Sequence, residues 1–293
     1  MNYKYYIYFM FYNIFRFIVY QSFFRNFAPK LITLIHMKKS ILFLAMLLCS
    51  IAASAKVITA VPEGDIAYYL SIAQPGDIIE LADGVYDEKS ILTFSVEGLV
   101  VKAAEGASPV IQTVGKWMKM NVEATTTFEG IVFDAEAGTD GDNQYGFDIS
   151  ANTTFNDCKF QDYTKYDVKI LAETTTFDNC IFNGAGVTPS AIIIDGTIAE
   201  CSIENCEFKN YKDYNISVED NTTITTLTID QCVLDGANTE SVKTTKAALF
   251  TKGIVSTSNI QDSEFKNFAE CAITVDKWYG GRFDALTING CLI

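Results

Sequence analysis

The chain has 293 residues, with 22 Lys and Arg, 36 Asp and Glu, and a single histidine, His36. Residues 1–55 hold six of the basic residues and no acidic ones, so the rest of the chain carries 16 basic and 36 acidic side chains, a net charge of −20. The absence of histidine from residues 56–293 excludes a Ser-His-Asp triad, a Cys-His pair and a histidine metal site there. The negative charge argues against nucleic acid and anionic membrane surfaces as partners.

Residues 1–36 are rich in Tyr, Phe, Asn and Ile and contain no acidic residue. The stretch 5–20 is mostly apolar, as a membrane helix would be, but Asn13 and Arg16 interrupt it. We therefore favour another interpretation, in which residues 1–36 are translated upstream sequence and the natural start is Met37.

Residues 37–55 have the three parts of a secretory signal peptide. Lys38 and Lys39 form a basic start, 41–51 is an apolar run, and Ala53-Ser54-Ala55 is a cleavage site of the A-x-A type. We expect residues 56–293 to form the mature domain, located outside the cell, in the periplasm or on the cell surface, and not inserted in a membrane.

The mature domain is predicted to begin with a short helix over 62–74, PEGDIAYYLSIAQ. Pro62 suits an early helical position, and Ile66, Tyr69, Leu70 and Ala73 would form an apolar face. Such a helix would cap the N-terminal end of the structure that follows it. Strands are predicted next, at 78–81 and 99–101.

A short phrase recurs along the rest of the chain: apolar, any residue, Asn/Asp/Gln/Gly, Cys, any residue, Phe/Leu. Its copies begin at Phe128, Phe155, Phe177, Ile203, Ile229, Ile260 and Ile288. Measured at the Cys position, the copies are separated by 22 to 31 residues. A repeat at this spacing is typical of a solenoid.

The repeat unit is predicted to consist of strands. Runs of Thr precede most copies, and alternation is clear in Cys-x-Phe and in 168–170, 216–218 and 273–275. The Asn or Asp before each Cys suits a tight bend, because these residues tolerate left-handed geometry. Three short strands per repeat predict an all-β, single-stranded, right-handed parallel β-helix with coils of 22–31 residues.

Cysteines of the mature domain follow the repeat, with five of the seven at the same repeat position (Cys158, Cys180, Cys206, Cys232, Cys291) and two elsewhere (Cys201, Cys271). Equivalent Cβ atoms on stacked coils should lie about 4.8 Å apart, wider than the roughly 3.5–4.5 Å of a disulfide. We expect free, buried thiols that pack as small apolar groups. No CxxC spacing supports a metal-thiolate site.

Two stretches near the start of the repeat carry a family resemblance. AQPGDIIELADGVYDE from Ala73 and VEGLVVKAAEGASPVI from Val96 resemble the start of the chondroitinase B and alginate lyase family of β-helix enzymes. They are also similar to secreted β-helix domains of gut Bacteroidetes. The resemblance covers 73–111 and implies the pectin-lyase-like fold, but a fold does not transfer an activity.

The resemblance also implies a catalytic Lys and Arg on neighbouring coils, with calcium held by one Asn and two Glu. The nearest equivalent of the Lys is Lys252, and the stretch 244–248 before it contains no glutamate. The position of the Arg falls near Asp276. The NTD and GHG motifs of β-helix polygalacturonases are absent as well. We therefore expect the family's catalytic set to be missing, and no catalytic residue is assigned.

Aligning the repeats places Asp195, Glu219, Lys252 and Asp276 in one outward column on successive coils, after Ser150 and Leu171. Asp195 and Glu219 should repel each other unless a cation lies between them, and Lys252 should pair with Glu219 or Asp276. Beside the column, 277–282 is an insertion that contains Trp278, Tyr279 and Arg282.

Two interpretations of this region are open. It is either a solvated charged face with a loop beside it, or a carbohydrate-binding site, since aromatic rings beside carboxylates suit sugar stacking and hydroxyl contacts. In the second interpretation the binding residues are Asp195, Glu219, Lys252, Asp276, Trp278, Tyr279 and Arg282.

Other features are weaker. A Gly-containing loop could hold calcium through Asp134, Glu136, Asp140, Asp142 and Asn143, although its spacing is not that of an EF-hand. No other cofactor is expected. Aromatic residues also recur at equivalent positions, and we expect them to pack the solenoid; they are Tyr163, Tyr211 and Phe268, and separately Tyr166 and Tyr214.

Three functions follow from these patterns. The first is a secreted β-helix domain that binds polysaccharide without cleaving it. The second is a polysaccharide lyase or glycoside hydrolase with a non-standard site, and the third is a structural or adhesin-like stalk. The net charge disfavours an anionic glycan unless cations bridge it.

Because the chain ends inside a repeat copy, we also expect a longer protein, or a further chain that covers the last coil.

Overall fold

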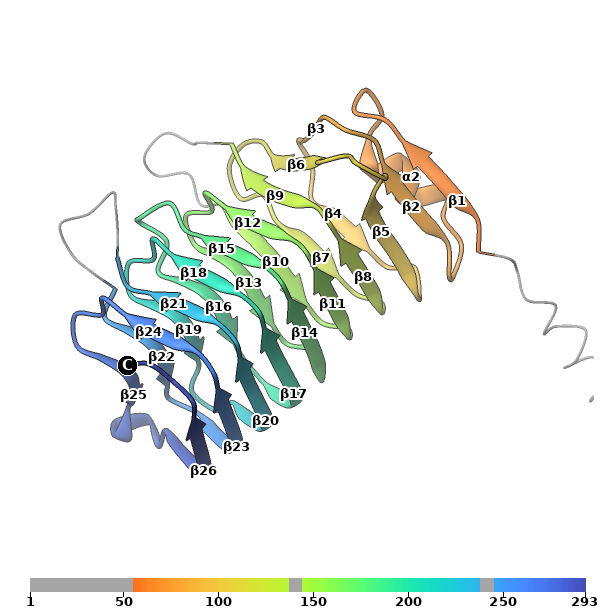
Figure 1. Ribbon diagram of the computed structural model, residues 1–293. Coiled ribbons are helices and arrows are strands. Elements are labelled where there is room, and N and C mark those ends of the chain that lie inside the picture. The colour runs from red at the N-terminus through yellow and green to blue at the C-terminus, as the bar shows by residue number, and fades with distance from the viewer. Residues whose placement is uncertain (1–54, 137–143, 238–244) are drawn as a thin grey trace, which may run out of the picture. The chain divides into compact units, whose positions relative to one another are not determined.

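The computed structural model describes residues 55–136, 144–237 and 245–293, all within one compact unit, Ala55–Ile293. The predicted segment 1–36 and the predicted signal peptide 37–55, apart from Ala55, lie outside the described residues. The described chain forms three sheets, here called A, B and C, in which every pairing between strands is parallel (Figure 1). The prediction of an all-β parallel solenoid is confirmed.

Sheet A has ten strands. They are β1 (Val57–Ala60), β2 (Ile78–Leu81), β5 (Leu99–Ala103), β8 (Thr126–Glu129), β11 (Thr153–Asn156), β14 (Thr174–Asp178), β17 (Thr197–Glu204), β20 (Thr223–Asp230), β23 (Ile254–Gln261) and β26 (Arg282–Asn289).

Sheets B and C have eight strands each. Sheet B consists of β3 (Val85–Glu88), β6 (Val110–Thr113), β9 (Val132–Ala135), β12 (Lys159–Gln161), β15 (Ile181–Asn183), β18 (Glu207–Lys209), β21 (Val233–Asp235) and β24 (Glu264–Lys266). Sheet C consists of β4 (Leu92–Phe94), β7 (Met120–Val122), β10 (Tyr145–Ile149), β13 (Tyr166–Ile170), β16 (Ser190–Ile194), β19 (Tyr214–Val218), β22 (Ala247–Thr251) and β25 (Cys271–Val275). Each coil crosses A, B and C in turn, which gives about eight turns.

The bend from sheet A to sheet B is the same in every copy of the phrase. Asp157, Asn179, Asn205, Gln231 and Asp262 have φ between 45° and 55°. Glycines with φ of 69° and 66° take this place in the first and last copies, at Gly130 and Gly290. Left-handed backbone is open to Gly and least costly otherwise for Asn and Asp, which explains the residue preference at this position.

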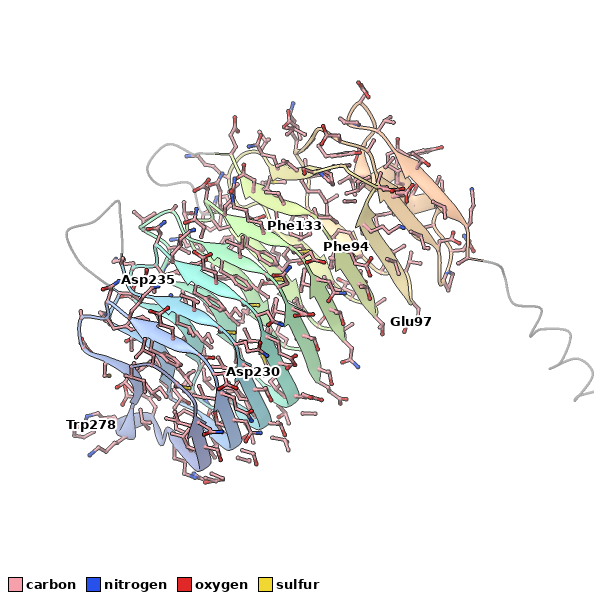
Figure 2. The ribbon with its side chains drawn as sticks, in the orientation of Figure 1. Phe94, Glu97, Phe133, Asp230, Asp235 and Trp278 are labelled. Carbon is pink, nitrogen blue, oxygen red and sulfur yellow. The ribbon has the colours of Figure 1, made fainter. Side chains whose placement is uncertain are left out.

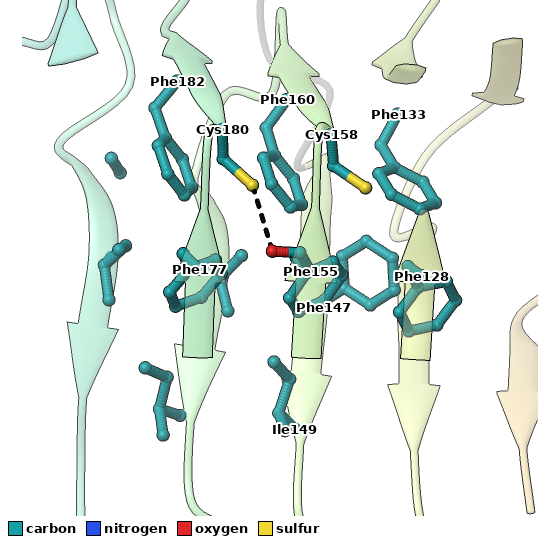
Figure 3. Close-up of a cluster of buried hydrophobic side chains, with 14 of the residues drawn as sticks. Phe128, Phe133, Phe147, Ile149, Phe155, Cys158, Phe160, Phe177, Cys180 and Phe182 are labelled. Carbon is teal, nitrogen blue, oxygen red and sulfur yellow. Dashed lines mark hydrogen bonds between the residues drawn. The ribbon is translucent and has the colours of Figure 1, made fainter. Parts of the chain in front are cut away.

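The core consists of stacked ladders of side chains that point inward from the three sheets (Figure 3). Phe128, Phe155 and Phe177 stack along sheet A with ring centroids 4.9 and 5.2 Å apart. Phe160, Phe182 and Phe208 do the same along sheet B at 4.8 and 4.5 Å. Full burial of each such ring contributes about 1.5–3 kcal/mol to folding.

The predicted thiol ladder is present. Cys158, Cys180, Cys206 and Cys232 are buried and free, and the N–H groups of Cys180 and Cys206 donate to the Sγ atom one coil further on, at 3.4 and 3.5 Å. Burial raises the pKa of Cys180 above its usual range, so its thiol stays protonated at neutral pH. Cys201 is also buried, whereas Cys271 is exposed and Cys291 is half-buried.

The helix predicted near the start is α2 (Ile66–Ile72), shorter than the predicted 62–74. Asp65 is its N-cap and accepts a hydrogen bond from the Ala67 N–H at 2.8 Å, so Pro62 lies outside the helix. Ile66 and Leu70 are buried, and the helix packs against β1 and β4. No helix within the described ranges is both long and apolar enough to cross a membrane.

The last coil differs from the coils before it in burial. Ile288 in β26 is 43% exposed, whereas its partner in β23, Ile260, is fully buried. Leu286 is likewise exposed, and its partner Ser258 is buried. The apolar ladders of the core therefore continue to the surface at the C-terminal coil.

Candidate functional site

The predicted charged column lies where the strands of sheet C end. Backbone N–H groups of Asp195, Glu219, Lys252 and Asp276 each donate to a carbonyl of the preceding coil at 2.9 Å. The last residues of the strands pair in the same order, from Ile194 to Val218, Thr251 and Val275. The structure thus brings these four residues together in the predicted register.

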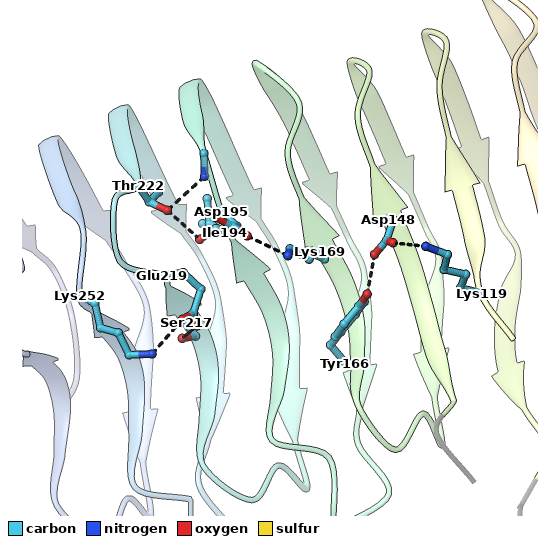
Figure 4. A network of polar contacts seen from close by, with 11 residues as sticks. Lys119, Asp148, Tyr166, Lys169, Ile194, Asp195, Ser217, Glu219, Thr222 and Lys252 are labelled. Carbon is cyan, nitrogen blue, oxygen red and sulfur yellow. Dashed lines mark hydrogen bonds and ion pairs between the residues drawn. The ribbon is translucent and has the colours of Figure 1, made fainter. Parts of the chain in front are cut away.

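Glu219 and Asp195 each form an ion pair with a lysine (Figure 4). Lys252 Nζ lies 2.8 Å from Glu219 Oε2, and the Ser217 hydroxyl donates to Glu219 Oε1 at 2.9 Å. Lys169 Nζ lies 2.8 Å from Asp195 Oδ2. Of the two partners predicted for Lys252, the structure selects Glu219, and the pairing of Asp195 with Lys169 was not predicted.

Lys252 also contacts two aromatic rings. Its Nζ atom lies 5.6 Å from the ring centroid of Phe250 and 5.8 Å from that of Tyr279. Burial lowers the pKa of Lys252, but the hydrogen bond to Glu219 and the charge of that carboxylate raise it more, so the pKa stands above its usual value. Lys252 is therefore a fixed cation at neutral pH.

Asp276 shapes the insertion that follows it. Its Oδ1 atom accepts a hydrogen bond from the Trp278 N–H at 2.9 Å, which caps the 3-10 helix η1 (Lys277–Tyr279). The turn closes through Gly280 and Gly281, and a Cβ atom on Gly281 would lie 2.4 Å from the Thr251 carbonyl oxygen. Asp276 is thus committed to the turn that presents Trp278.

The insertion leaves its aromatic rings in solvent. Trp278 is 97% exposed and projects from the last coil, and Tyr279 is 60% exposed (Figure 2). An open concavity of about 570 Å³ lies beside Trp278 and is lined by Phe250, Thr274, Val275, Asp276, Lys277 and Trp278.

Arg282 lies elsewhere than predicted. It is the first residue of β26 in sheet A, opposite Ile254, and its Nε atom pairs with Asp284 Oδ1 at 2.8 Å. The insertion therefore ends at Gly281, because Arg282 already belongs to the sheet A ladder.

Sequence reasoning missed much of the aromatic surface on the outer face of sheet C. Rings of Tyr214 and Phe250 stack at 4.3 Å between centroids, and those of Tyr145 and Tyr166 lie edge to face at 5.2 Å. Tyr166 and Tyr214 do occupy equivalent positions, but Ser190 lies between them in the ladder and both are half-exposed. The packing role expected of both aromatic sets is confirmed for Tyr163 and Tyr211, which are fully buried, and for Phe268, which packs partly buried against the core, but not for Tyr166 and Tyr214.

The predicted calcium loop is described only in part, since Asp140, Asp142 and Asn143 lie outside the described residues. Asp134 accepts a hydrogen bond from Gln112 Nε2 at 3.2 Å, and burial raises the pKa of its carboxyl. Among residues 55–136, 144–237 and 245–293, no three His, Cys, Asp or Glu side chains gather as metal ligands would. The calcium site stays a prediction.

Comparisons with known proteins give matches only among solved structures, since no protein-family model and no curated protein matches the chain. An alginate lyase from Paenibacillus sp. str. FPU-7 is 12% identical with a TM-score of 0.57, over 80% of this chain and 95% of that chain. Pectate lyase Pel9A is 12% identical with a TM-score of 0.47, over 82% of this chain and 79% of that chain.

The chain has the parallel β-helix fold of polysaccharide lyases. At this level of identity the likeness extends to the fold and no further. What the outer face of sheet C does has to be argued from its own residues.

Proposed function

We propose that the domain binds a polysaccharide on the outer face of sheet C, around the concavity beside Trp278. The observation that carries this proposal is Trp278 itself, which is 97% exposed at the rim of the concavity. A ring in this position adds almost no buried area to the fold, and with Phe250 and Val275 it forms a continuous apolar lining of the hollow, which is the kind of surface that marks an interaction site. Trp rings offer a flat apolar surface on which the C–H face of a sugar stacks.

The polar groups around the concavity suit the hydroxyl groups of a sugar. Asp276 lines the hollow, and Glu219 and Asp195 lie two and three coils before it in the same column, beyond Lys252. Ion pairs and the Ser217 hydroxyl hold Glu219 and Asp195 in fixed orientations, so little side-chain freedom is lost when a ligand binds. The solved structures of similar fold include an alginate lyase and a pectate lyase, which act on polysaccharides.

Binding without cleavage is part of the proposal. β-Elimination needs a base that is unprotonated at the working pH. Lys252, the residue nearest to the family's catalytic lysine, is held protonated by Glu219.

Secretion directed by residues 37–55 also belongs to the proposal, because a polysaccharide-binding domain works outside the cell.

The test is a glycan array probed with residues 56–293, with and without calcium, followed by titration of the best ligand. Trp278→Ala should weaken binding about tenfold, because one stacked ring contributes about 1.4 kcal/mol. Tyr68→Ala is the matched control, since Tyr68 is a 59% exposed ring on α2 at the other end of the solenoid. The affinity of Tyr68→Ala for the glycan should equal that of the unchanged protein.

The same samples separate the three functions. Binding without the ultraviolet absorbance of unsaturated products or new reducing ends supports a binding domain. Appearance of either product would favour the lyase or hydrolase. Failure to bind any glycan on the array would contradict both and leave the stalk.

A further inference from the structure

We infer that the glycan taken by this face is uncharged. This inference rests on the proposed function and narrows it to a class of ligand. It follows from the ion pairs that the lysines of this face already form with carboxylates of the protein.

Four lysines of the face each hold a carboxylate. Nζ–O distances are 2.6 Å from Lys119 to Asp148, 2.8 Å from Lys169 to Asp195, 2.7 Å from Lys246 to Asp213 and 2.8 Å from Lys252 to Glu219. Recognition of a uronic acid requires a cation free to pair with the sugar carboxylate. On this face those cations are neutralised before a ligand arrives.

The pair beside the concavity shows what an acidic sugar would meet. To reach Lys252, a sugar carboxylate would have to displace Glu219 or share the ammonium with it. Glu219 is anchored a second time by the Ser217 hydroxyl, and both side chains of the ion pair are about three-quarters covered, with relative exposures of 27% and 28%. Two carboxylates at one ammonium repel each other more strongly at a partly covered site than in bulk water.

The field of the whole domain acts in the same direction. Residues 56–293 carry a net charge of −20, which repels a polyanion before contact. Lys277 at the rim of the concavity is exposed, but it lies beside Asp276. One exposed lysine does not offset the charge of the domain.

The apolar groups at the hollow suit an uncharged ligand. Phe250 lines it and stacks on Tyr214, and Trp278 stands at the rim. Such rings take the C–H faces of neutral pyranoses, and the fixed carboxylates accept hydrogen bonds from their hydroxyl groups.

The experiment compares glycans that differ in charge alone. The probes are polygalacturonate, alginate and hyaluronan, each in its native form and after reduction of the uronate carboxyls to primary alcohols, beside the neutral glycans of the array. Titrations are run without divalent cations at low and at physiological salt. We expect the hits to be neutral glycans. In any pair that binds, the reduced member should bind at least about tenfold more tightly, because its alcohol can donate a hydrogen bond to a fixed carboxylate that repels the uronate of the native member.

A variant that breaks the Lys252–Glu219 ion pair tests whether this pair causes the preference for neutral glycans. Glu219→Gln keeps an oxygen that can accept the hydrogen bond from Ser217, but leaves the charge of Lys252 without a carboxylate partner. The ratio of acidic to neutral affinity should rise about tenfold, and the gain should shrink at high salt. Glu264→Gln is the matched control, since it frees Lys266 from a 3.2 Å pair on sheet B and changes the net charge equally. Its ratio should stay at the starting value.

Each result decides between the two proposals. A preference for the acidic members, or equal affinity within the pairs, overturns the inference and leaves the binding function standing. An unchanged ratio in Glu219→Gln overturns the assignment of paired lysines as the cause. Failure of every glycan on the array to bind overturns the binding function, and the inference with it.

Discussion

Asp167 is the most unusual single residue of the domain. It lies in β13 with no exposed surface, its Oδ2 atom accepts a hydrogen bond from the Tyr211 hydroxyl, and its Oδ1 atom has no hydrogen-bond partner in the described part of the chain. Burial raises the pKa of Asp167 to about 8. Glu88, buried under the start of α2, shifts in the same direction, to about 7.

These shifts predict that stability falls as pH rises. A carboxyl whose pKa is higher in the folded state contributes its full stability below the unfolded pKa and loses it as pH rises to the folded pKa. For Asp167 the window runs from 3.8 to about 8, and for Glu88 from 4.5 to about 7. Urea unfolding should therefore give a lower free energy of unfolding at pH 8 than at pH 5.

Asp167→Asn isolates the contribution of one group. The variant should show a clearly smaller difference between pH 5 and pH 8, because an amide does not titrate. Asp284→Asn, a change on the exposed strand β26, serves as control and should keep the full difference. A variant whose pH dependence equals that of the starting protein would show that Asp167 does not titrate in this range.

At the scale of elements, large and small residues alternate along the corner between sheets B and C. The ring of Tyr211 fills the space beside Gly184, where a Cβ atom would lie 2.8 Å from it, and reaches Asp167 two coils back. Phe268 takes the equivalent place against Gly236, at 2.7 Å. Two coils back from Phe268 lies Asn215, a buried amide whose nitrogen and oxygen have no partner among the described residues.

Phe268→Tyr should therefore stabilise the domain by about 1 kcal/mol, because a hydroxyl at that ring would satisfy a buried amide. Tyr211→Phe should cost about 1–3 kcal/mol, since it removes the partner of Asp167. Thermal and urea unfolding measure both changes. In Asn215→Ala the effect of Phe268→Tyr should vanish, and a gain that persists there would come from some other contact.

Much of this element-scale order could be predicted from the sequence. The residue before each Cys is one that tolerates left-handed backbone, which fixed the bend, and period-two alternation fixed the order of the column from Asp195 to Asp276. Alternation says which face a side chain takes, but not which diagonal neighbour it meets. The pairing of Lys169 with Asp195 and the use of Asp276 as a cap were therefore out of reach.

Asp167 escaped prediction for a different reason. Both Asp167 and Val168 are buried at the start of β13, so alternation fails at that corner. The aromatic surface was missed because Tyr166 and Tyr214 looked like Tyr163 and Tyr211 in the alignment of repeats. Only the three-dimensional structure distinguishes Tyr163 and Tyr211, which lie before the corner, from Tyr166 and Tyr214, which lie after it.

At the scale of the whole molecule, the thiols predict a two-step titration. A reagent that reads free thiols should react in native residues 56–293 with the exposed Cys271 and the half-buried Cys291, and after denaturation without reductant with seven cysteines. Buried thiols with raised pKa react slowly because the thiolate is the reactive form. Three disulfides found in the denatured protein would contradict the ladder.

Protection of the backbone should also be uneven along the solenoid. Amide hydrogens of β17 and β20 lie between two neighbouring coils, whereas β26 exposes apolar side chains such as Ile288. Hydrogen exchange should therefore be slowest in the central coils and fastest in β26, since local opening exposes least new surface at the last coil. Uniform exchange from β5 to β26 would indicate a single cooperative unit instead.

The fixed bend between sheets A and B has a consequence for how such a chain can change over generations. Every copy of the phrase passes this bend with one left-handed residue, so the differences in repeat length, from 22 to 31 residues, fall at the other two corners and in the strands of sheet A, which lengthen from four residues in β11 to eight in β17. Duplication of a gene segment that encodes one coil would add a rung without disturbing the rungs on either side. The row of rings and carboxylates on sheet C could lengthen in this way, one coil at a time, while the corners diverge in sequence and size.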